Sequence, residues 1–333
     1  MTAPLTTFAI PCRNAGEHLR PLLESLLAQT DQDFAMLLVD DASDDGSPAR
    51  ARAIAGTRLQ VLVNDEPLGL AANWNRAVEA SRSDFVCLAH QDDVYHPEYL
   101  AVMLDALRTD REQALVHCRA TTMDADGQPL RAPAEDFKAR WWQRHAGEPP
   151  GEPATAYREL LRGNFVCCPS ILYRRELFAS VGGFRPDLRF TPDWDLLFRA
   201  LLADWRFASV DRALVRYRRH AASATQREAA SLNRYREELA TLRAAAAAGR
   251  DRGLLRPAPP IGAAVRNNLL LDAYHDLCAG RADAARRKLA FGRREVPGFA
   301  RDPLAFGVRV ASRLGGLGSA ALGLGLRAVL RMA

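Results

Sequence analysis

The sequence predicts an α/β fold in which a mostly parallel, Rossmann-like sheet is flanked by helices and followed by a helical C-terminal extension. Short apolar runs alternate with helical stripes through the first 120 residues. This alternation is typical of parallel strands whose connecting helices cover both faces of one sheet. Acidic pairs stand where two of the apolar runs end, and the chain beyond Arg227 is rich in Ala, Arg and Leu, which favours helices.

Apolar periodicity places the individual elements. Apolar runs predict strands at residues 8–10, 35–39, 59–63, 85–89 and 115–118. Stripes with a helical period predict helices at residues 18–29, 48–54, 70–80 and 97–107. Residues 121–153 are rich in Asp, Gly, Pro and charge and are expected to form a long loop or insert. An apolar segment at 166–173 and a helix at 193–202 follow it.

Composition narrows the class of protein. The six cysteines contain no C-x-x-C pair and lie mostly in apolar strings, which indicates buried reduced thiols and no zinc site. The N-terminus lacks a signal peptide pattern, and the uncharged stretch Leu314–Leu326 has 13 residues against the roughly 20 of a membrane-spanning helix. We expect a cytoplasmic protein. The pI near 9.0 comes without a basic-aromatic motif, so we expect no nucleic-acid partner.

Four carboxylates are expected to meet at one edge of the predicted sheet. In open α/β sheets, ligands bind at the carboxyl ends of the strands. Asp40 and Asp41 follow one predicted strand, and Asp92 and Asp93 lie just after another. Like charges repel at such an edge unless a cation or hydrogen-bond donors lie between them.

The acidic segments each have a functional and a local interpretation. Asp40 or Asp41 can accept hydrogen bonds from a uracil or ribose group, or the segment can be a helix-capping turn. Asp92 and Asp93 suit Mg²⁺ or Mn²⁺, which neutralise charge on a nucleotide diphosphate leaving group, or they belong to a solvated helix cap. His90 either orients a carboxylate or phosphate, or packs against its neighbours.

Two later segments also have two possible interpretations each. Asp193 stands where a helix is predicted to begin, so it is either a general base that deprotonates an acceptor hydroxyl or an N-cap. The Tyr-Arg-Arg-His sequence at 217–220 either brings positive charge to a diphosphate or forms a solvated face. No G-x-x-x-x-G-K-[ST] phosphate loop occurs, which excludes a P-loop ATPase.

Together these segments resemble glycosyltransferase family 2, with its GT-A fold, over about residues 7–225. Seven segments resemble the family's motifs in the family's order. They are I-P-C-R-N at 10–14, E-S-L-L-A-Q-T at 24–30, V-D-D-A-S-D-D-G-S at 39–47, N-D-E-P-L-G-L-A-A-N-W-N-R-A at 64–77, L-A-H-Q-D-D at 88–93, G-G-F at 182–184 followed by D-W-D-L at 193–196 with Arg199, and Y-R-R-H at 217–220.

The resemblance implies a role for each matching residue. Asp193 would be the catalytic base of a single inverting displacement at the anomeric carbon, and Asp93 with Asp92 would hold Mg²⁺ or Mn²⁺. Asp41 would bind the nucleotide base. The residues implied to bind the nucleotide sugar are Pro11, Arg13, Asn14, Asp40, Asp41, Asn73, Asn75, Gln91 and Asp92. Residues implied to contact the diphosphate or the acceptor are His90, Trp194, Asp195, Arg218 and His220.

Three positions depart from the family's pattern. His90 stands where the first Asp of the metal motif is usual, which leaves Asp92 and Asp93 to hold the metal. Pro192 replaces the usual Glu before Asp193, which bears on acceptor contacts. Trp74 replaces the family's Arg, which bears on a nucleotide contact.

We therefore expect an inverting, metal-dependent glycosyltransferase. It would move a sugar from a UDP-, dTDP- or GDP-linked donor to a hydroxyl of a saccharide or lipid-linked acceptor, in cell-surface polysaccharide or glycolipid synthesis. The alternative is a non-catalytic nucleotide-sugar-binding protein or scaffold on the same fold, since fold does not fix function. A nucleotidyltransferase is disfavoured because no Gly-rich triphosphate loop lies near the first strand.

The charge is divided unevenly between two predicted domains. The whole chain has a net charge of +5, but residues 226–333 hold 19 Lys and Arg against 9 Asp and Glu, so this part carries +10 and residues 1–225 carry −5. We expect residues 1–225 to be the GT-A catalytic domain and residues 226–333 a basic helical extension. Its stretch from Arg309 to Arg331 fits a peripheral helix on the anionic inner face of a membrane. The alternative is packing on the catalytic domain or in a homo-oligomer.

Overall fold

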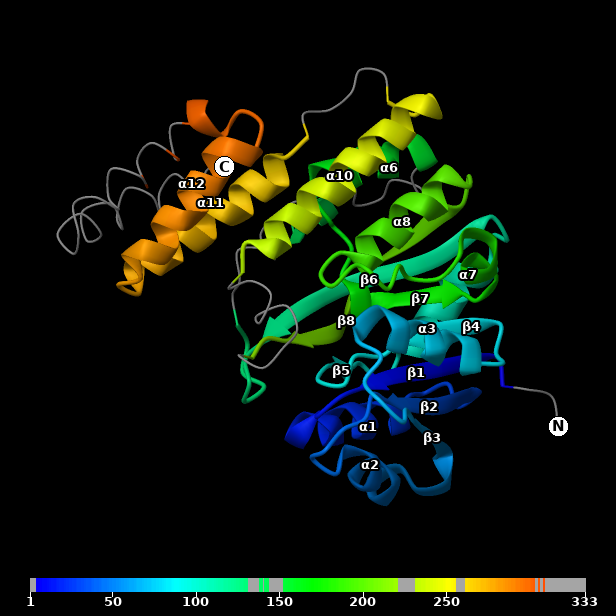
Figure 1. The fold of residues 1–333 in the computed structure, drawn as a ribbon. Coiled ribbons are helices and arrows are strands. Elements are labelled where there is room, and N and C mark those ends of the chain that lie inside the picture. The colour runs from blue at the N-terminus through cyan, green and yellow to red at the C-terminus, as the bar shows by residue number, and fades with distance from the viewer. Residues whose placement is uncertain are drawn as a thin grey trace.

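A mixed sheet flanked by helices forms the centre of the molecule (Figure 1). The computed structural model describes residues 4–130, 138–139, 141–143, 152–220, 231–255, 261–302, 305 and 308. Within these residues the sheet has eight strands in the order β3-β2-β1-β4-β7-β6-β8-β5. The C-terminal helices lie beyond α8, on the side of the sheet opposite α1 and α2 (Figure 1).

The first half of the sheet is parallel, as the alternation in the sequence predicts. Its strands are β1 (Thr6–Cys12), β2 (Phe34–Asp40), β3 (Leu59–Val63) and β4 (Phe85–Leu88). β1 pairs in parallel with β2 and β4, and β2 pairs in parallel with β3. The carboxyl ends of these four strands therefore reach one edge of the sheet.

The second half of the sheet mixes strand directions. β7 (Ile171–Arg174) runs antiparallel to β4 and to β6 (Gln113–Met123), whereas β8 (Arg206–Arg218) runs parallel to β6. The short β5 (Val94–Tyr95) pairs antiparallel with β8. The sequence analysis missed β8 because charged residues recur through it and interrupt any apolar run. Since β8 points the same way as β1, it brings residues 217–220 to the same edge.

Two apolar layers separate the sheet from its helices. The helices α1 (Leu19–Leu27), α2 (Ser47–Ala55) and α4 (Tyr99–Arg108) cover one face. The helices α3 (Leu70–Ala80), α6 (Pro153–Arg162), α7 (Glu176–Val181) and α8 (Pro192–Leu202) cover the other. Successive side chains of β1 point to opposite faces of the sheet, so Phe8 and Ile10 pack in the first layer and Ala9 packs in the second. Short 3-10 helices occupy Gly16–His18, Gly56–Arg58, Cys168–Ser170 and Phe299–Arg301.

The predicted loop at residues 121–153 is shorter than expected. β6 continues to Met123, α6 begins at Pro153, and residues 138–139 and 141–143 are helical. Trp141 and Trp142 are buried, and their rings lie 5.6 and 5.2 Å from the ring of His117. Aromatic packing therefore fixes part of this insert on the sheet. Burial lowers the pKa of His117 to about 3, so this histidine is neutral.

The C-terminal extension packs on the first 225 residues through α10 (Asn233–Asp251), which contacts α6 and α8. Helix α11 (Ala263–Cys278) packs on α10, and α12 (Ala282–Glu295) packs on α11. The Tyr157 hydroxyl of α6 donates to the Ala245 carbonyl of α10 (2.6 Å). A Cβ added at Gly249 would lie 2.6 Å from the Tyr157 ring, so α10 needs glycine for this close approach. Residues 309–333, including the predicted membrane-facing stretch, lie outside the described residues. Of the described helices, none is long and apolar enough to cross a membrane.

Candidate active site

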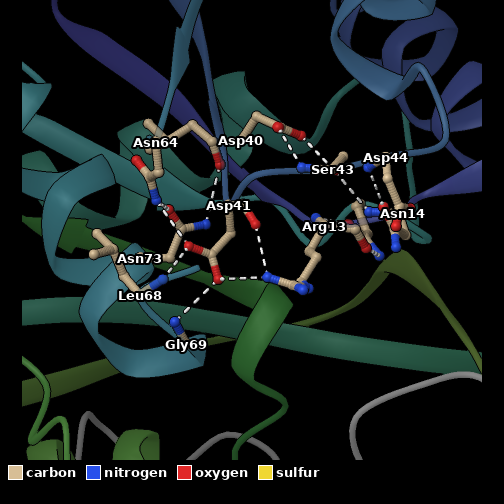
Figure 2. Close-up of polar contacts among 12 residues, drawn as sticks. Arg13, Asn14, Asp40, Asp41, Ser43, Asp44, Asn64, Leu68, Gly69 and Asn73 are labelled. Atoms are coloured by element: carbon tan, nitrogen blue, oxygen red, sulfur yellow. Dashed lines mark hydrogen bonds and ion pairs between the residues drawn. The ribbon is translucent and has the colours of Figure 1, made fainter. Parts of the chain in front are cut away.

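The parallel register continues past the strand ends and aligns the polar residues that follow. The Asp41 N–H donates to the Cys12 carbonyl (2.7 Å), and the Asn64 N–H donates to the Asp40 carbonyl (2.8 Å). The ends of β1, β2 and β3 therefore stand side by side. Figure 2 shows the cluster of polar side chains that this alignment creates.

The Asp41 carboxylate is held by donors from the loop after β3 (Figure 2). One oxygen accepts the Asn64 side-chain amide (2.8 Å) and the Leu68 N–H (2.7 Å), and the other accepts the Gly69 N–H (3.0 Å). The Arg13 guanidinium lies 3.8 Å away. Only 3% of Asp41 is exposed. Asp41 is thus a fixed hydrogen-bond acceptor directly after β2, and the base contact predicted for it stays a prediction.

Asp40 is engaged in a turn. Its two carboxylate oxygens accept the Ser43 N–H (2.9 Å) and the Ser43 hydroxyl (2.6 Å), and the residue is fully buried. Asn14 continues this network, because its N–H donates to the Ser43 hydroxyl oxygen (2.8 Å) and its side-chain oxygen accepts the Asp44 N–H (3.1 Å). Asp40 therefore forms a turn with Ser43 that does not cap α2, whose N-cap is Gly46. The donor contact of Asp40 stays a prediction.

Arg13 and Gln91 join the ends of β1 and β4. The Gln91 side-chain oxygen accepts the Arg13 N–H (2.7 Å), and its amide donates to the Arg13 carbonyl (3.1 Å). The Arg13 guanidinium donates to the Asp41 carbonyl (2.8 Å) and remains about half exposed, so it can reach a ligand. Pro11 lies inside β1, opposite Val39 of β2. These contacts place Arg13 and Gln91 at the predicted edge.

Asn73 and Asn75, predicted to bind the donor, have packing contacts in the structure. Asn73 accepts the Asn64 amide (3.0 Å) and donates to the Val39 carbonyl (3.0 Å). Asn75 accepts the Phe184 N–H and donates to the Phe184 carbonyl, both at 2.7 Å. Helix α3 thereby connects to the loop after α7. A donor contact from either amide stays a prediction.

Asp92 and Asp93 differ in exposure. The Asp93 side chain is completely buried, and one of its oxygens accepts the Arg218 N–H (2.8 Å). The other oxygen has no hydrogen-bond partner within the described chain. Burial, and next the charge of Asp92, raise the pKa of Asp93 well above its usual range. Asp92 is 15% exposed and lies 2.8 Å from the His220 imidazole, so it is the more accessible of the two.

The end of β8 supports this acidic pair. The Arg218 guanidinium donates to the carbonyls of Asp92 (2.8 Å), Asp124 (3.2 Å) and Ala125 (2.8 Å), and only 5% of the residue is exposed. Arg218 thus binds protein backbone, whereas a diphosphate contact had been predicted for it. His220 reaches Asp92, with the ring of His18 4.6 Å from its own.

His90 packs against Trp74. Their ring centroids are 5.3 Å apart, and burial lowers the pKa of His90, which favours the neutral imidazole. His90 Nδ1 lies 3.9 Å from the unbonded oxygen of Asp93. The two departures from the family pattern, Trp74 and His90, therefore contact each other beside Asp93.

Asp193 lies in the first turn of α8 and is partly buried. Its carboxylate accepts a hydrogen bond from the Asn164 side-chain amide (3.2 Å). Burial raises the pKa of Asp193 above its usual value, while backbone and Asn164 hydrogen bonds oppose the shift. The structure describes no side-chain cap bond at the start of α8, so the N-cap interpretation gains no support from this described helix.

The residues after Asp193 hold the preceding loop. Asp195 pairs with Arg199 (2.8 Å), whose guanidinium donates to the carbonyls of Gly182 (3.0 Å) and Gly183 (2.8 Å). Trp194 is buried and donates its indole N–H to the Leu160 carbonyl (3.2 Å). Both side chains therefore have protein contacts, and the diphosphate or acceptor contacts predicted for Trp194 and Asp195 stay predictions.

Three residues of the site were missed by sequence analysis. Asn64 and Asn164 bind the carboxylates of Asp41 and Asp193, and Glu237 of α10 binds the backbone just before α8. Asn64 lies within a motif segment and could have been singled out. The other two carry no local pattern, because their partners are 29 and 46 positions away in the chain.

The chain belongs to glycosyl transferase family 2, whose profile matches residues 7–182. It is 28% identical over 208 residues to the succinoglycan biosynthesis protein ExoO of Rhizobium meliloti, covering 62% of this chain and 58% of that protein. Alignments of this chain with the first four curated relatives each cover between 31% and 70% of the relative's own length.

Solved structures share the GT-A fold. The S. aureus TarS fragment 1–349 in complex with UDP-GlcNAc aligns with a TM-score of 0.55 at 16% identity, covering 92% of this chain and 79% of that one. The mannosyltransferase PcManGT from Pyrobaculum calidifontis, in complex with GDP-Man and Mn²⁺, aligns with a TM-score of 0.57 at 17% identity, covering 96% and 85%. The predicted family and fold are thereby confirmed.

Proposed function

We propose that this glycosyltransferase is an inverting enzyme that uses a nucleotide-sugar donor and a divalent cation. The observation that carries the proposal is the acidic pair after β4. Asp92 is accessible, and the adjacent Asp93 keeps one buried oxygen without a hydrogen-bond partner within the described chain. Two neighbouring carboxylates are costly to ionise together unless a cation offsets their charge.

The donor set fits Mg²⁺ or Mn²⁺. These ions prefer oxygen ligands, and Mg²⁺ is commonly held by one or two carboxylates together with substrate phosphates and water. No cluster of three or more His, Cys, Asp or Glu that could hold a metal occurs within the described ranges, so the protein's share would come from Asp92 and Asp93. The ion would supply positive charge beside the departing nucleoside diphosphate. Binding of Mn²⁺ with GDP-Man in PcManGT supports this choice.

The base end of the donor is assigned to Asp41. Uracil, thymine and guanine each present a ring N–H, and a carboxylate that is fixed by three donors can accept a further hydrogen bond from such a group. The exposed Arg13 guanidinium beside it adds positive charge for the diphosphate. UDP-, dTDP- and GDP-linked sugars are therefore the donor class, in keeping with UDP-GlcNAc in TarS and GDP-Man in PcManGT.

Asp193 is assigned the role of general base. It would accept the proton of the acceptor hydroxyl as that oxygen attacks the anomeric carbon from the face opposite the nucleotide, which inverts the configuration. A pKa raised by burial makes the carboxylate a stronger base than an exposed aspartate. The names of relatives such as ExoO support a saccharide or lipid-linked acceptor in surface polysaccharide synthesis. We place the enzyme in the cytoplasm, with the membrane as an additional site of contact for residues beyond 308.

A thermal-shift panel tests the donor and the ion together. Nucleoside diphosphates and nucleotide sugars are added to the full chain with and without Mn²⁺, because a ligand that binds only the folded state raises Tm. We expect at least one UDP, dTDP or GDP compound to raise Tm only when Mn²⁺ is present. An unchanged Tm across the whole panel would contradict donor binding. Binding without sugar transfer to any of a broad set of acceptors would favour the scaffold alternative.

A further inference from the structure

The loop between α7 and α8 leads directly to Asp193 and is held at both ends. At its start, Asn75 binds the Phe184 backbone and Arg199 binds the carbonyls of residues 182 and 183. These contacts come from α3 and α8. At its end, the loop is held by α10, which belongs to the C-terminal extension and lies beyond the family match at residues 7–182.

Glu237 of α10 makes this second attachment. One of its oxygens accepts the N–H groups of Phe190 and Thr191, both at 2.7 Å, and the Thr191 hydroxyl at 3.0 Å. The other oxygen accepts the Arg189 N–H at 3.0 Å. A single carboxylate thus gathers three consecutive backbone N–H groups immediately before α8 begins at Pro192. Hydrogen bonds to an ionised acceptor are the stronger kind.

Other α10 side chains bind the same segment. The Thr241 hydroxyl lies 2.8 Å from the hydroxyl of Thr191, which is 1% exposed. The Arg234 guanidinium stacks over the Phe190 ring at 4.5 Å and pairs with Glu238. Because these contacts come from one face of α10, the helix holds the segment as a unit.

A backbone hydrogen bond links the segment held by α10 to the turn that carries Asp193, the proposed general base. The Thr191 carbonyl accepts the Asp195 N–H (3.0 Å), which closes the first turn of α8, and Asp193 lies within that turn. Any movement of residues 189–191 therefore moves the turn that carries the Asp193 carboxylate. The donor-side acidic residues are held separately: the Asp41 carboxylate by the loop after β3, and the Asp92 backbone carbonyl by Arg218 of β8.

We propose that Glu237 is a positioning residue for Asp193, so that the C-terminal extension completes the catalytic site. The inference rests on the proposed role of Asp193 as base. Removing the Glu237 carboxylate leaves three N–H groups without their acceptor, and the loop relaxes. Misplacement of a catalytic group by about 1 Å can reduce turnover roughly 100-fold. Donor binding, which depends on the opposite edge of the site, is unaffected.

The test compares Glu237→Ala with Glu237→Gln and with Asp251→Ala. Asp251 is exposed at the other end of α10, so its variant removes the same charge from the same helix. Glu237→Gln keeps one oxygen acceptor, and this variant also serves if Glu237→Ala does not fold. The measurements are kcat and donor KM of sugar transfer by the full chain with Mn²⁺, and hydrogen exchange of the amides of residues 189–195.

We expect kcat to fall about 10- to 100-fold in Glu237→Ala, with intermediate loss in Glu237→Gln and none in Asp251→Ala. Donor KM stays at the wild-type value, and exchange at residues 189–195 becomes faster only in the Glu237 variants. Wild-type kcat in a folded Glu237→Ala protein would overturn this inference alone. A rise in donor KM with unchanged kcat would overturn it as well, because it would place Glu237 on the donor side. Absence of transfer by the wild type would overturn the proposed function, and this inference with it.

Discussion

Two parts of the candidate site are held by different kinds of contact. The donor edge is the edge of the sheet that carries Asp41 and Asp92, and the base loop is the segment between α7 and α8 that leads to Asp193. At the donor edge, Asp41 is bound by residues 23 to 28 positions away, which follow the adjacent strand. At the base loop, Phe184 is bound by Asn75, 109 positions earlier, and Thr191 by Glu237, 46 positions later. The first region follows from local strand order, whereas the second requires the whole chain to be folded.

The carboxylates of the site also differ in how fully their oxygens accept hydrogen bonds from the protein. Asp40 and Asp41 accept hydrogen bonds from neutral donors on both oxygens. Asp93 and Asp193 have raised pKa values because burial penalises their charged forms more than their hydrogen bonds compensate. Groups that a fold leaves incompletely satisfied are candidates for binding and catalysis. This pattern directs attention to Asp93, with its neighbour Asp92, and to Asp193.

The largest effect on the donor edge is expected from Asp92→Asn. Loss of a charged contact to the cation costs about 1.5–3 kcal/mol, so Mn²⁺-dependent donor affinity should fall about 10- to 100-fold. Tm without ligand should change little, because asparagine keeps a side-chain oxygen and nearly the same volume at this 15%-exposed position. Isothermal titration calorimetry with UDP or GDP and Mn²⁺ measures the affinity. Wild-type affinity would remove Asp92 from the ion site.

Asp93→Asn provides the matched contrast within this pair. Its raised pKa means that the ionised carboxylate weakens the fold, by an amount that appears as pH rises through that pKa. An asparagine keeps an acceptor for the Arg218 N–H without the charge. We expect Tm at neutral pH to equal or exceed that of the wild type, with reduced Mn²⁺-dependent binding. A large drop in Tm would show that the charge itself stabilises this region.

The pH dependence of transfer should be set by the base loop. Asp193 acts in its ionised form, and its pKa is raised by burial, so kcat should fall about tenfold per pH unit as pH drops below that pKa. Protonation of Asp193 does not itself destabilise the protein, because a raised carboxyl pKa favours the folded state at low pH. The Asn164 hydrogen bond lowers this pKa, so Asn164→Ala should move the acidic limb to higher pH. An unmoved limb would exclude Asp193 as the titrating base.

A smaller effect on transfer, mainly through stability, is expected from Asn75→Ala. The variant leaves the Phe184 N–H and carbonyl without their partner, which costs about 1–3 kcal/mol of unfolding free energy. Urea denaturation measures it, with Asn267→Ala, an exposed position on α11, as the control. Donor affinity at fixed temperature should stay close to wild type. A loss of affinity without a loss of stability would restore the direct donor contact predicted for Asn75.

The parallel half of the fold could be predicted because its pattern is local. The helix at residues 70–80 and the strand at 59–63 match the structure at both ends, since apolar periodicity alone determines them. β8 could not be predicted in the same way. Charged residues interrupt its apolar stretches, and its partner β6 lies about 90 positions earlier, so its pairing depends on the tertiary fold.

For the candidate site as well, the sequence predicted the local features but not the contacts that depend on the tertiary fold. The positions of residues 40–41 and 92–93 after two predicted parallel strands correctly placed these carboxylates at one edge of the sheet. It could not show that Arg218, a cation on sequence grounds, binds three backbone carbonyls, or that Asn75 binds the Phe184 backbone. Such contacts depend on side-chain direction and on loops that pack after the sheet has formed. Glu237 was missed for the same reason, because its partners lie in another element.

The division between donor edge and base loop is tested most directly by measuring donor affinity and sugar transfer on one preparation of Asp193→Asn. General-base catalysis contributes about 100- to 10,000-fold, so transfer should fall by that range while Mn²⁺-dependent donor affinity equals that of the wild type. Tm should equal or exceed the wild-type value, because the raised pKa of Asp193 marks a charge that weakens the fold. Transfer at the wild-type rate, or an equal loss of donor affinity, would contradict the account.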